Sequence, residues 1–136
     1  MKSLFIIAST ILTASIALAG QNNLAMREAG KYSGFESVGT HEQGDACTLE
    51  VLKIKKSLLG KIKAMTIKLN DSDAAIALTC SYDMENGKLC QGKSDIYSIH
   101  LNPREGYHED YYPTIIYRNL QVEDKYIVCD WLTKIN

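Results

Sequence analysis

The sequence AMTIKLNDSDAAIALTC, residues 64–80, contains two alternating runs separated by turn-forming residues. Met, Ile and Leu occupy every second position over 65–69, and Ile, Leu and Cys do so over 76–80. Side chains two residues apart lie on the same face of an extended strand, so each run predicts a strand with one buried face. The polar segment 70–73 between them favours a turn. This stretch therefore predicts a hairpin of two antiparallel strands.

Short apolar runs of the same kind continue along the chain, and no later segment shows a long helical stripe. Residues 21–29 predict one or two turns of helix before Gly30. About seven to eight strands at the observed spacing are typical of an all-β antiparallel meander that forms a small barrel or sandwich. The predicted strands are 31–39, 46–56, 61–69, 74–82, 88–101 (which a break near Lys93 would divide), 111–120 and 125–134.

The first residues have the three parts of a secretory signal peptide. Lys2 precedes an apolar run that ends in the small-x-small triplet Ala17-Leu18-Ala19. A membrane anchor is the alternative, but polar residues interrupt the run and it is short for a spanning helix. We expect residues 1–19 to be a signal peptide and residues 20–136 to form a single β domain. The first cysteine is Cys47, so we expect a soluble periplasmic or extracellular protein that is not a lipoprotein.

Composition narrows the class of protein. The chain has 136 residues, of which 46% are hydrophobic, with 15 basic and 16 acidic side chains. These proportions are typical of a globular domain and exclude a disordered, coiled-coil or collagen-like chain. A net charge of −1 also disfavours nucleic acid as the partner, because phosphate binding requires a basic excess.

An even number of cysteines in a small exported domain indicates disulfides, here two. Cys80 ends one predicted strand and Cys90 begins the next. The two residues oppose each other if 83–87 forms a five-residue loop, but not if Asn86-Gly87 forms a tight two-residue turn.

Cys47 begins its predicted strand at the opposite end of the sheet from Cys80 and Cys90. A bond to either would span more than the usual Cα separation of about 4.4–6.8 Å. We therefore favour the pairs Cys47–Cys129 and Cys80–Cys90. A metal or redox site is the rival interpretation, but the sequence has no Cys-x-x-Cys.

Motifs for catalysis or metal binding are missing from the sequence. It contains no Gly-x-Ser-x-Gly, no Ser-x-x-Lys and no His-Glu-x-x-His. His100 and His108 with a carboxylate of 109–110 could form an open metal site, but a solvated loop explains them more simply. We predict no metal and no cofactor, and we expect a protein without enzymatic activity, with a small periplasmic hydrolase as an alternative.

One candidate binding surface is the lysine hairpin, residues 53–68. It contains six lysines and no acidic residue, and its tip is Ser57-Leu58-Leu59-Gly60. Lys55, Leu58, Leu59 and Lys61 could contact an anionic membrane surface or an acidic protein. Lysines on a solvated edge hairpin also prevent aggregation between sheets, which is the alternative explanation.

A second candidate surface is the tyrosine loop, residues 102–113. Long loops in compact domains are often functional, and tyrosines supply rigid, amphipathic contact area. The loop is acidic where the hairpin is basic, which suggests a polarised domain. Packing of the tyrosines against the barrel mouth is the alternative. The predicted binding residues are Tyr107, His108, Tyr111 and Tyr112.

Gly30-Lys31-Tyr32 before the first strand resembles the Gly-x-aromatic opening of lipocalin-like barrels, with Tyr where family members have Trp. The resemblance implies a closed barrel that holds a small apolar ligand or binds another protein.

Strict alternation in the last strand places Trp131 on the face of Cys129 and Leu132 on the other face. Residues that could line a ligand cavity are Tyr32, Phe35, Met65, Ile67, Tyr97 and Trp131.

From the sequence we expect an exported, non-enzymatic, disulfide-stabilised binding protein of inhibitor or immunity type. We expect it to bind an unidentified protein partner through the tyrosine loop and the lysine hairpin. A carrier of a small apolar ligand is the main alternative.

Overall fold

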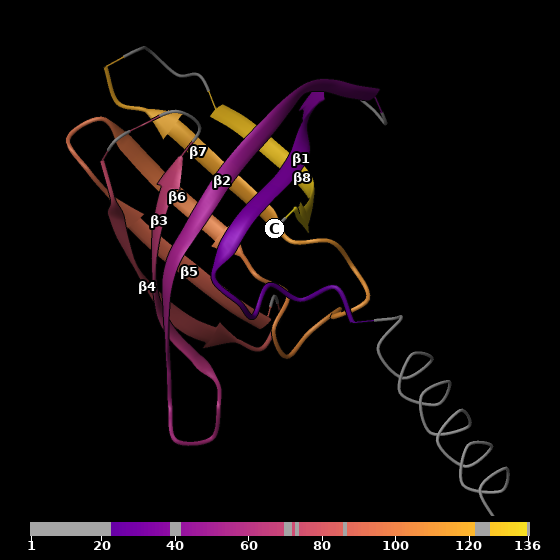
Figure 1. The fold of residues 1–136 in the computed structure, drawn as a ribbon, viewed down its shortest axis with the longest axis vertical. Helices are drawn as coiled ribbons and strands as arrows, with labels where there is room; N and C mark the ends of the chain where they lie inside the picture. Colours follow the sequence, from indigo (N-terminus) through magenta and orange to yellow (C-terminus); the bar gives the residue numbers. More distant parts are fainter. Residues whose placement is uncertain are drawn as a thin grey trace, which may run out of the picture.

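The computed structural model describes residues 23–38, 42–69, 72, 74–85, 87–121 and 126–135. In this part of the chain, antiparallel strands follow one another in order and close into a barrel (Figure 1). Each strand pairs with the next, and β1 also pairs with β8. The all-β meander is confirmed, as a barrel. The strands are β1 (Gly30–Val38), β2 (Glu42–Lys56), β3 (Ile62–Leu69), β4 (Ile76–Asp83), β5 (Gly87–Lys93), β6 (Tyr97–Asn102), β7 (Thr114–Asn119) and β8 (Tyr126–Lys134).

The eighth strand arises where the sequence suggested a break. The predicted run 88–101 is divided after Lys93 into β5 and β6. Ser94 forms the turn between them, because its hydroxyl accepts hydrogen bonds from the backbone N–H groups of Ile96 and Tyr97 at 3.2 and 3.0 Å. A side chain that satisfies backbone donors in this way favours a turn over a continued strand.

The predicted helix before Gly30 is wrong for residues 23–29, which are not helical; residues 21 and 22 lie outside the described part. The N–H of Leu24 donates to the carbonyl of Glu109 at 2.7 Å, and that of Met26 donates to the carbonyl of Pro103 at 2.8 Å. These donors are therefore used across the end of the barrel instead of within a helix. Met26 is fully buried.

The interior of the barrel carries apolar side chains from every strand, as alternation predicted. An eight-stranded barrel encloses a space about as wide as the side chains that fill it. Of the residues that the sequence suggested as cavity lining, Tyr32, Met65 and Ile67 are buried, whereas Phe35 is 40% exposed. The other large buried side chains include Leu49, Val51, Ile62, Leu78, Ile99, Leu101, Ile115, Tyr117 and Leu132.

Both predicted disulfides are present. Cys80 lies directly opposite Cys90 in the β4–β5 pair, because Asp83 pairs with Gly87. The second disulfide joins Cys47 of β2 to Cys129 of β8, with their Cα atoms 6.2 Å apart. Since β2 and β8 are the two neighbours of β1, this bond links strands from the beginning and the end of the meander.

A bulge in β8 corrects the alternation predicted for the last strand. Ser33 pairs with Thr133 and Phe35 with Asp130, so two β8 residues face Gly34. The extra residue turns Leu132 into the core, where it is 1% exposed. Trp131 has a φ of 55°. A Cβ atom at position 34 would collide with the carbonyl oxygen of Asp130, so the close approach requires glycine.

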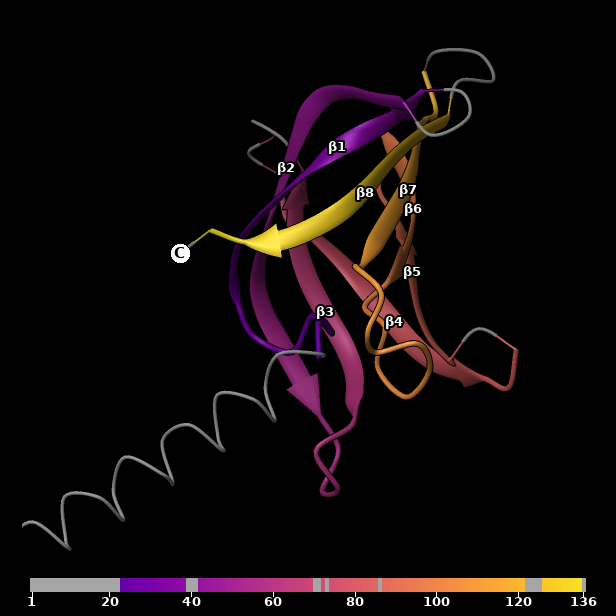
Figure 2. The same ribbon diagram turned by 90° about the vertical axis from the view of Figure 1, so that its right-hand side faces the viewer.

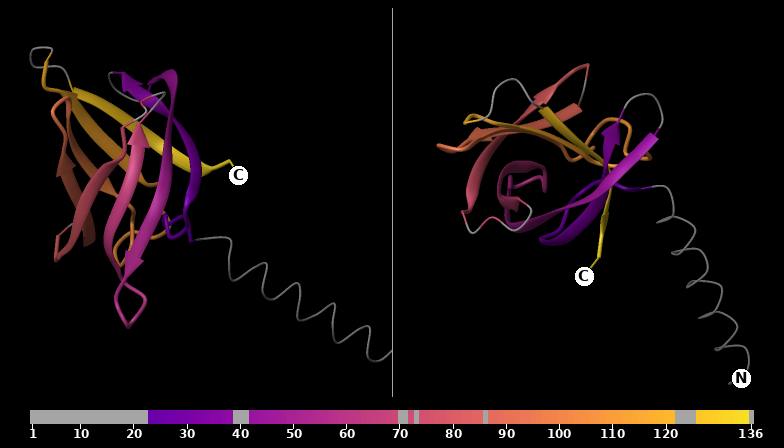
Figure 3. Two further views of the ribbon diagram at one scale, coloured as in Figure 1. Left: turned by 60° about the vertical axis from the view of Figure 1, so that its left-hand side comes forward. Right: turned by 90° about the horizontal axis from the view of Figure 1, so that it is seen from above.

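One end of the barrel carries both surfaces suggested by the sequence. In an antiparallel meander, the connections after even-numbered strands share an end. The loop end therefore comprises the segment 23–29, the tip of the lysine hairpin, the β4–β5 turn and the tyrosine loop. Figures 2 and 3 show the hairpin extending past the other strands at this end.

Candidate functional site

The tyrosine loop presents a stack of three rings on the outside of the loop end. The rings of His108 and Tyr111 are stacked, with centroids 4.5 Å apart and an interplanar angle of 8°. Tyr107 packs edge-on against His108, with centroids 4.0 Å apart. The N–H of Tyr111 donates to the carbonyl of His108 at 2.9 Å, which closes a turn between the stacked residues. The stack is therefore fixed by local backbone structure as well as by ring contacts.

Arg104 extends this arrangement on the other side of Tyr111. Its guanidinium carbon lies 5.7 Å from the Tyr111 ring centroid, and its Nε donates to the carbonyl of Tyr112 at 3.1 Å. Both Arg104 and His108 have a positive φ, of 65° and 50°. Non-glycine residues seldom adopt this conformation, and it persists where surrounding contacts enforce it. Tyr111 and Tyr112 remain 51% and 38% exposed.

Glu109 ties the tyrosine loop to the segment before β1. Its Oε1 lies 2.7 Å from Nη2 of Arg27 and accepts a hydrogen bond from the N–H of Gly106 at 3.0 Å. Its Oε2 accepts a hydrogen bond from the side-chain amide of Asn23 at 3.4 Å. Together with the backbone bonds of Leu24 and Met26, these contacts hold two chain segments as one layer across the end of the barrel.

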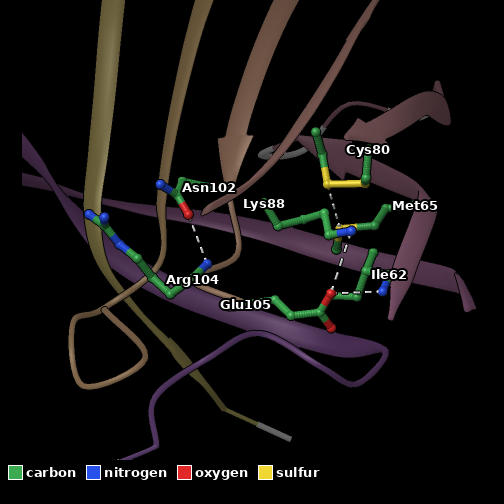
Figure 4. The surroundings of a disulfide bond; sticks show 8 residues. Ile62, Met65, Cys80, Lys88, Asn102, Arg104 and Glu105 are labelled. Carbon is green, nitrogen blue, oxygen red and sulfur yellow. Dashed lines mark hydrogen bonds and ion pairs between the residues drawn. A yellow bond between two sulfur atoms is a disulfide. The ribbon is translucent and has the colours of Figure 1, made fainter. Parts of the chain in front are cut away.

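Glu105 ties the same loop to the lysine hairpin and to β5. It is the only buried charged residue in the described ranges, at 1% exposure. Its Oε1 accepts a hydrogen bond from the N–H of Ile62 at 2.9 Å and lies 3.8 Å from Nζ of Lys88, as Figure 4 shows. Its backbone carbonyl accepts a hydrogen bond from the N–H of Lys88 at 3.1 Å. In the same view, the Cys80–Cys90 disulfide lies beside Met65, whose sulfur is 3.7 Å from Cys90 Sγ.

The β4–β5 turn packs closely against Tyr107 of the aromatic stack. A Cβ atom at Gly87 would lie 2.6 Å from Cβ of Tyr107, so glycine permits the close approach of the loop. Gly87 also has a φ of 74°. At the tip of this turn Met84 is 88% exposed. The turn thus adds an apolar projection to the loop end.

The lysine hairpin projects two leucines into solvent. Leu58 and Leu59 have relative exposures of 107% and 88%, the two largest values among large hydrophobic side chains in the described ranges, the second shared with Met84. The tip is a closed turn: the N–H of Ser57 donates to the carbonyl of Lys61 at 2.7 Å, and the N–H of Gly60 donates to the carbonyl of Ser57 at 2.9 Å. Lys55 and Lys61 are exposed beside it.

The expected charge separation between loop and hairpin is not what the structure shows. Both lie at the loop end, and two of the three acidic residues of the loop are neutralised. Glu105 is buried beside Lys88, and Glu109 is paired with Arg27. Asp110 remains exposed. The loop end is therefore basic around the hairpin, whereas the tyrosine loop is mainly aromatic.

The predicted binding residues form two groups at this end. Tyr107, His108 and Tyr111 are brought together in the stack, with Tyr112 next to it. Lys55, Leu58, Leu59 and Lys61 lie at the hairpin tip. The sequence analysis missed the residues that hold these groups in place, Arg104, Glu105 and Arg27. A carboxylate followed by glycine next to a strand end is too common a pattern to have indicated the buried role of Glu105.

Two open grooves flank Tyr112. One, of about 330 Å³, is lined by Arg104, Asp110, Tyr111, Tyr112, Asp130 and Trp131. The other, of about 350 Å³, lies between Tyr112 and the segment 23–28. Both open beside the loop, and the larger one is also lined by the core residues Tyr32 and Leu132.

The described residues contain neither a metal-binding cluster nor a membrane-spanning helix. Across the ranges that the structure describes, no group of three or more His, Cys, Asp and Glu side chains could hold a metal ion. Nor does any helix in those ranges have the length and apolar character needed to cross a membrane. His100 lies exposed on β6 and His108 lies in the aromatic stack, while His41 lies outside the described ranges.

Comparisons of the chain with protein-family models, with curated proteins and with solved structures each return no match. The barrel is of the kind that the lipocalin-like resemblance implied, an all-β antiparallel barrel of eight strands. The two disulfides are characteristic of an oxidising, non-cytoplasmic compartment.

Proposed function

We propose that this chain is an exported, non-enzymatic protein that binds another protein through its loop end, as an inhibitor or immunity-type protein does. The tyrosine loop is the recognition surface, and the lysine hairpin lies at its side. Residues 1–19 serve as the signal peptide that directs the chain to the periplasm or the cell exterior. The observation that carries the proposal is the exposed stack of Tyr107, His108 and Tyr111 on a braced loop.

Rigid exposed aromatic side chains suit protein recognition for a physical reason. Tyrosine and arginine are enriched among the residues that dominate binding energy, because they bury a large area and keep a polar group for hydrogen bonding. Binding also costs less conformational entropy when the surface is already ordered. Glu109 and Arg104 provide that order here, through an ion pair with Arg27 and a hydrogen bond to the Tyr112 carbonyl.

The proposal is tested by affinity capture from the native envelope extract, with the captured proteins identified by mass spectrometry. The loop variant carries Tyr107→Ala, Tyr111→Ala and Tyr112→Ala. Alanine keeps the Cβ atom of residue 107 that packs against Gly87. We expect the variant to lose a partner that the unmodified chain captures, while its thermal midpoint stays the same.

A matched control is Tyr126→Ala. Tyr126 begins β8, away from the loop end, and is 60% exposed. This variant should capture the same partner as the unmodified chain. If the loop variant and the control capture identical sets of proteins, the tyrosine loop is not the recognition surface.

A further inference from the structure

The tip of the lysine hairpin is an apolar projection whose leucine side chains do not pack against the barrel. Leu58 and Leu59 are almost completely exposed. The turn between β2 and β3 that contains them extends beyond the ends of the neighbouring strands (Figure 2). Single exposed leucines are common on protein surfaces, but two adjacent ones at the apex of a projecting turn form a concentrated apolar point. Nothing in the described part of the chain covers them.

Lysines surround this apolar apex. Lys55, Lys56, Lys61 and Lys63 are all exposed within a few residues of the leucines. The β2–β3 register is irregular between Lys55 and Lys56, which pair with Ala64 and Ile62. Ile62 faces the core, whereas Ala64 precedes the core residue Met65, so the two lysine side chains project to opposite faces of the hairpin. None of the ion pairs among the described residues involves a hairpin lysine. Of these four lysines, Lys56 interacts electrostatically with Glu28, whose own ion pair is with Lys134. The hairpin therefore keeps an excess of positive charge on both faces.

The shape of this arrangement distinguishes between two kinds of anionic partner. A protein surface usually contacts one side of a projection, so lysines on the other face would contribute little. A lipid surface meets a projection from its tip and surrounds it, so the leucines enter the acyl boundary while lysines on both faces contact headgroups. A convex apolar apex within a basic ring therefore fits a membrane surface better than a protein.

We propose that the apex of the lysine hairpin docks on an anionic lipid surface, with Leu58 and Leu59 inserted and Lys55, Lys56, Lys61 and Lys63 on the headgroups. This role goes beyond protein binding by the tyrosine loop and uses different residues. The hydrogen bonds of Ser57 and Gly60 form the tip before it meets the membrane, so little conformational entropy is lost on docking. In this arrangement the hairpin apex is the part of the barrel that contacts the membrane.

The proposal is tested by co-sedimentation with vesicles of phosphatidylcholine that contain one quarter phosphatidylglycerol, and with vesicles of phosphatidylcholine alone. We expect binding to the anionic vesicles that weakens at high salt, since charge screening reduces attraction to headgroups. The double variant Lys55→Gln, Lys61→Gln should bind about 30-fold more weakly, which corresponds to about 1 kcal/mol per lysine. Leu58→Ser with Leu59→Ser should reduce binding by at least about tenfold.

Matched controls separate the hairpin from general charge and hydrophobicity. Lys31→Gln with Lys93→Gln removes the same charge from exposed lysines on β1 and β5. Leu120→Ser changes a leucine that is 40% exposed in the turn after β7. Both controls should bind like the unmodified chain. The apolar segment before residue 20 is the same in every variant, so differences between variants report on the hairpin.

Three outcomes would overturn the proposal. These are equal binding to both kinds of vesicle, no difference between the hairpin variants and their controls, and hairpin-dependent binding to a soluble acidic protein with no binding to anionic vesicles. Partner capture by the tyrosine loop is measured separately with the Tyr107, Tyr111 and Tyr112 variant. Failure of either proposal therefore leaves the other standing.

Discussion

The Oε1 atom of Glu105 accepts a hydrogen bond from the backbone N–H of Ile62 at 2.9 Å, across 43 residues of sequence. Glu105 belongs to the tyrosine loop, and Ile62 is the first residue of β3, next to the tip of the lysine hairpin. Both residues are buried, and Lys88 lies within ion-pair distance of the same oxygen atom. One buried carboxylate thus fixes the two candidate surfaces relative to each other.

We expect Glu105→Ala to destabilise the fold by about 3 kcal/mol, because it leaves a buried N–H and a mostly buried ammonium without their partner. Glu105→Gln keeps an acceptor for Ile62 and should cost less. Urea denaturation measures the difference, and hydrogen exchange at the Ile62 amide reports the lost bond. An alanine variant as stable as the unmodified chain would contradict the role given to this residue.

The two disulfides should differ in their contribution to stability. Cys47–Cys129 closes a separation of 82 residues, and Cys80–Cys90 closes one of 10. In the chain-entropy description the long closure contributes about 4–5 kcal/mol and the short one about 2–3 kcal/mol. Replacing each pair by alanine, followed by denaturant unfolding, tests this order. A larger loss from the Cys80 and Cys90 pair would show that chain entropy does not dominate here.

Gly34→Ala should destabilise the barrel by about 2 kcal/mol, since the added methyl group meets the carbonyl of Asp130 at the β8 bulge. Ser33→Ala is the control at the adjacent position, where the backbone carbonyl, not the side chain, accepts the hydrogen bond of Thr133. Thermal unfolding of the two variants measures the difference. Equal midpoints would mean that the bulge can move away at little cost.

Stability should fall at alkaline pH through two buried tyrosines. Burial raises the pKa of Tyr32 and of Tyr117. The folded state therefore holds these phenolic protons more tightly than the unfolded state. This contribution is fully present below the ordinary tyrosine pKa of about 10 and is lost as the pH rises through the raised folded value.

Tyr117→Phe should reduce the slope of unfolding free energy against pH above pH of about 10, because it removes one of the groups that release protons on unfolding. Tyr126→Phe changes an exposed tyrosine and serves as the comparison. Denaturant unfolding between about pH 8 and 11 provides the measurement. Identical slopes for both variants and the unmodified chain would exclude Tyr117 as a source of the alkaline loss.

Alternation predicted much of the fold because the period of two is a local property of the strand. It placed Met65, Ile67 and Leu78 in the core, and reasoning about strand direction paired Cys80 with Cys90. It failed at Leu132, because the bulge that turns this residue inward depends on close approach to Gly34 of another strand. The separate expectation of a helix before Gly30 failed at residues 23–29, because the N–H groups of Leu24 and Met26 donate to carbonyls of the tyrosine loop.

The candidate surfaces were predicted with less detail than the fold. The sequence drew attention to the tyrosines and to the lysine-flanked leucines through composition alone. It gave no indication that Tyr107, His108 and Tyr111 stack. It also gave no indication that Glu105 and Glu109 form ion pairs with Lys88 and Arg27. The expected opposite charge of loop and hairpin was therefore wrong. Pairing of charges depends on distances that linear spacing does not determine.

The sequence by itself determined the class of fold and the segments to examine, and it favoured the two cysteine pairs. Strand periodicity and turn residues act over a few residues, and chain direction follows from strand order. Only the tertiary structure decided that the meander closes with β1 beside β8, and that the hairpin and the tyrosine loop share one end. It also decided that the buried carboxylate of Glu105 joins them. The shared end follows from the division of the run 88–101 into β5 and β6, which makes the tyrosine loop the connection after an even-numbered strand. Closure of the barrel and the contacts of Glu105 depend on how far the sheet curls and which distant groups meet, and no local pattern specifies either.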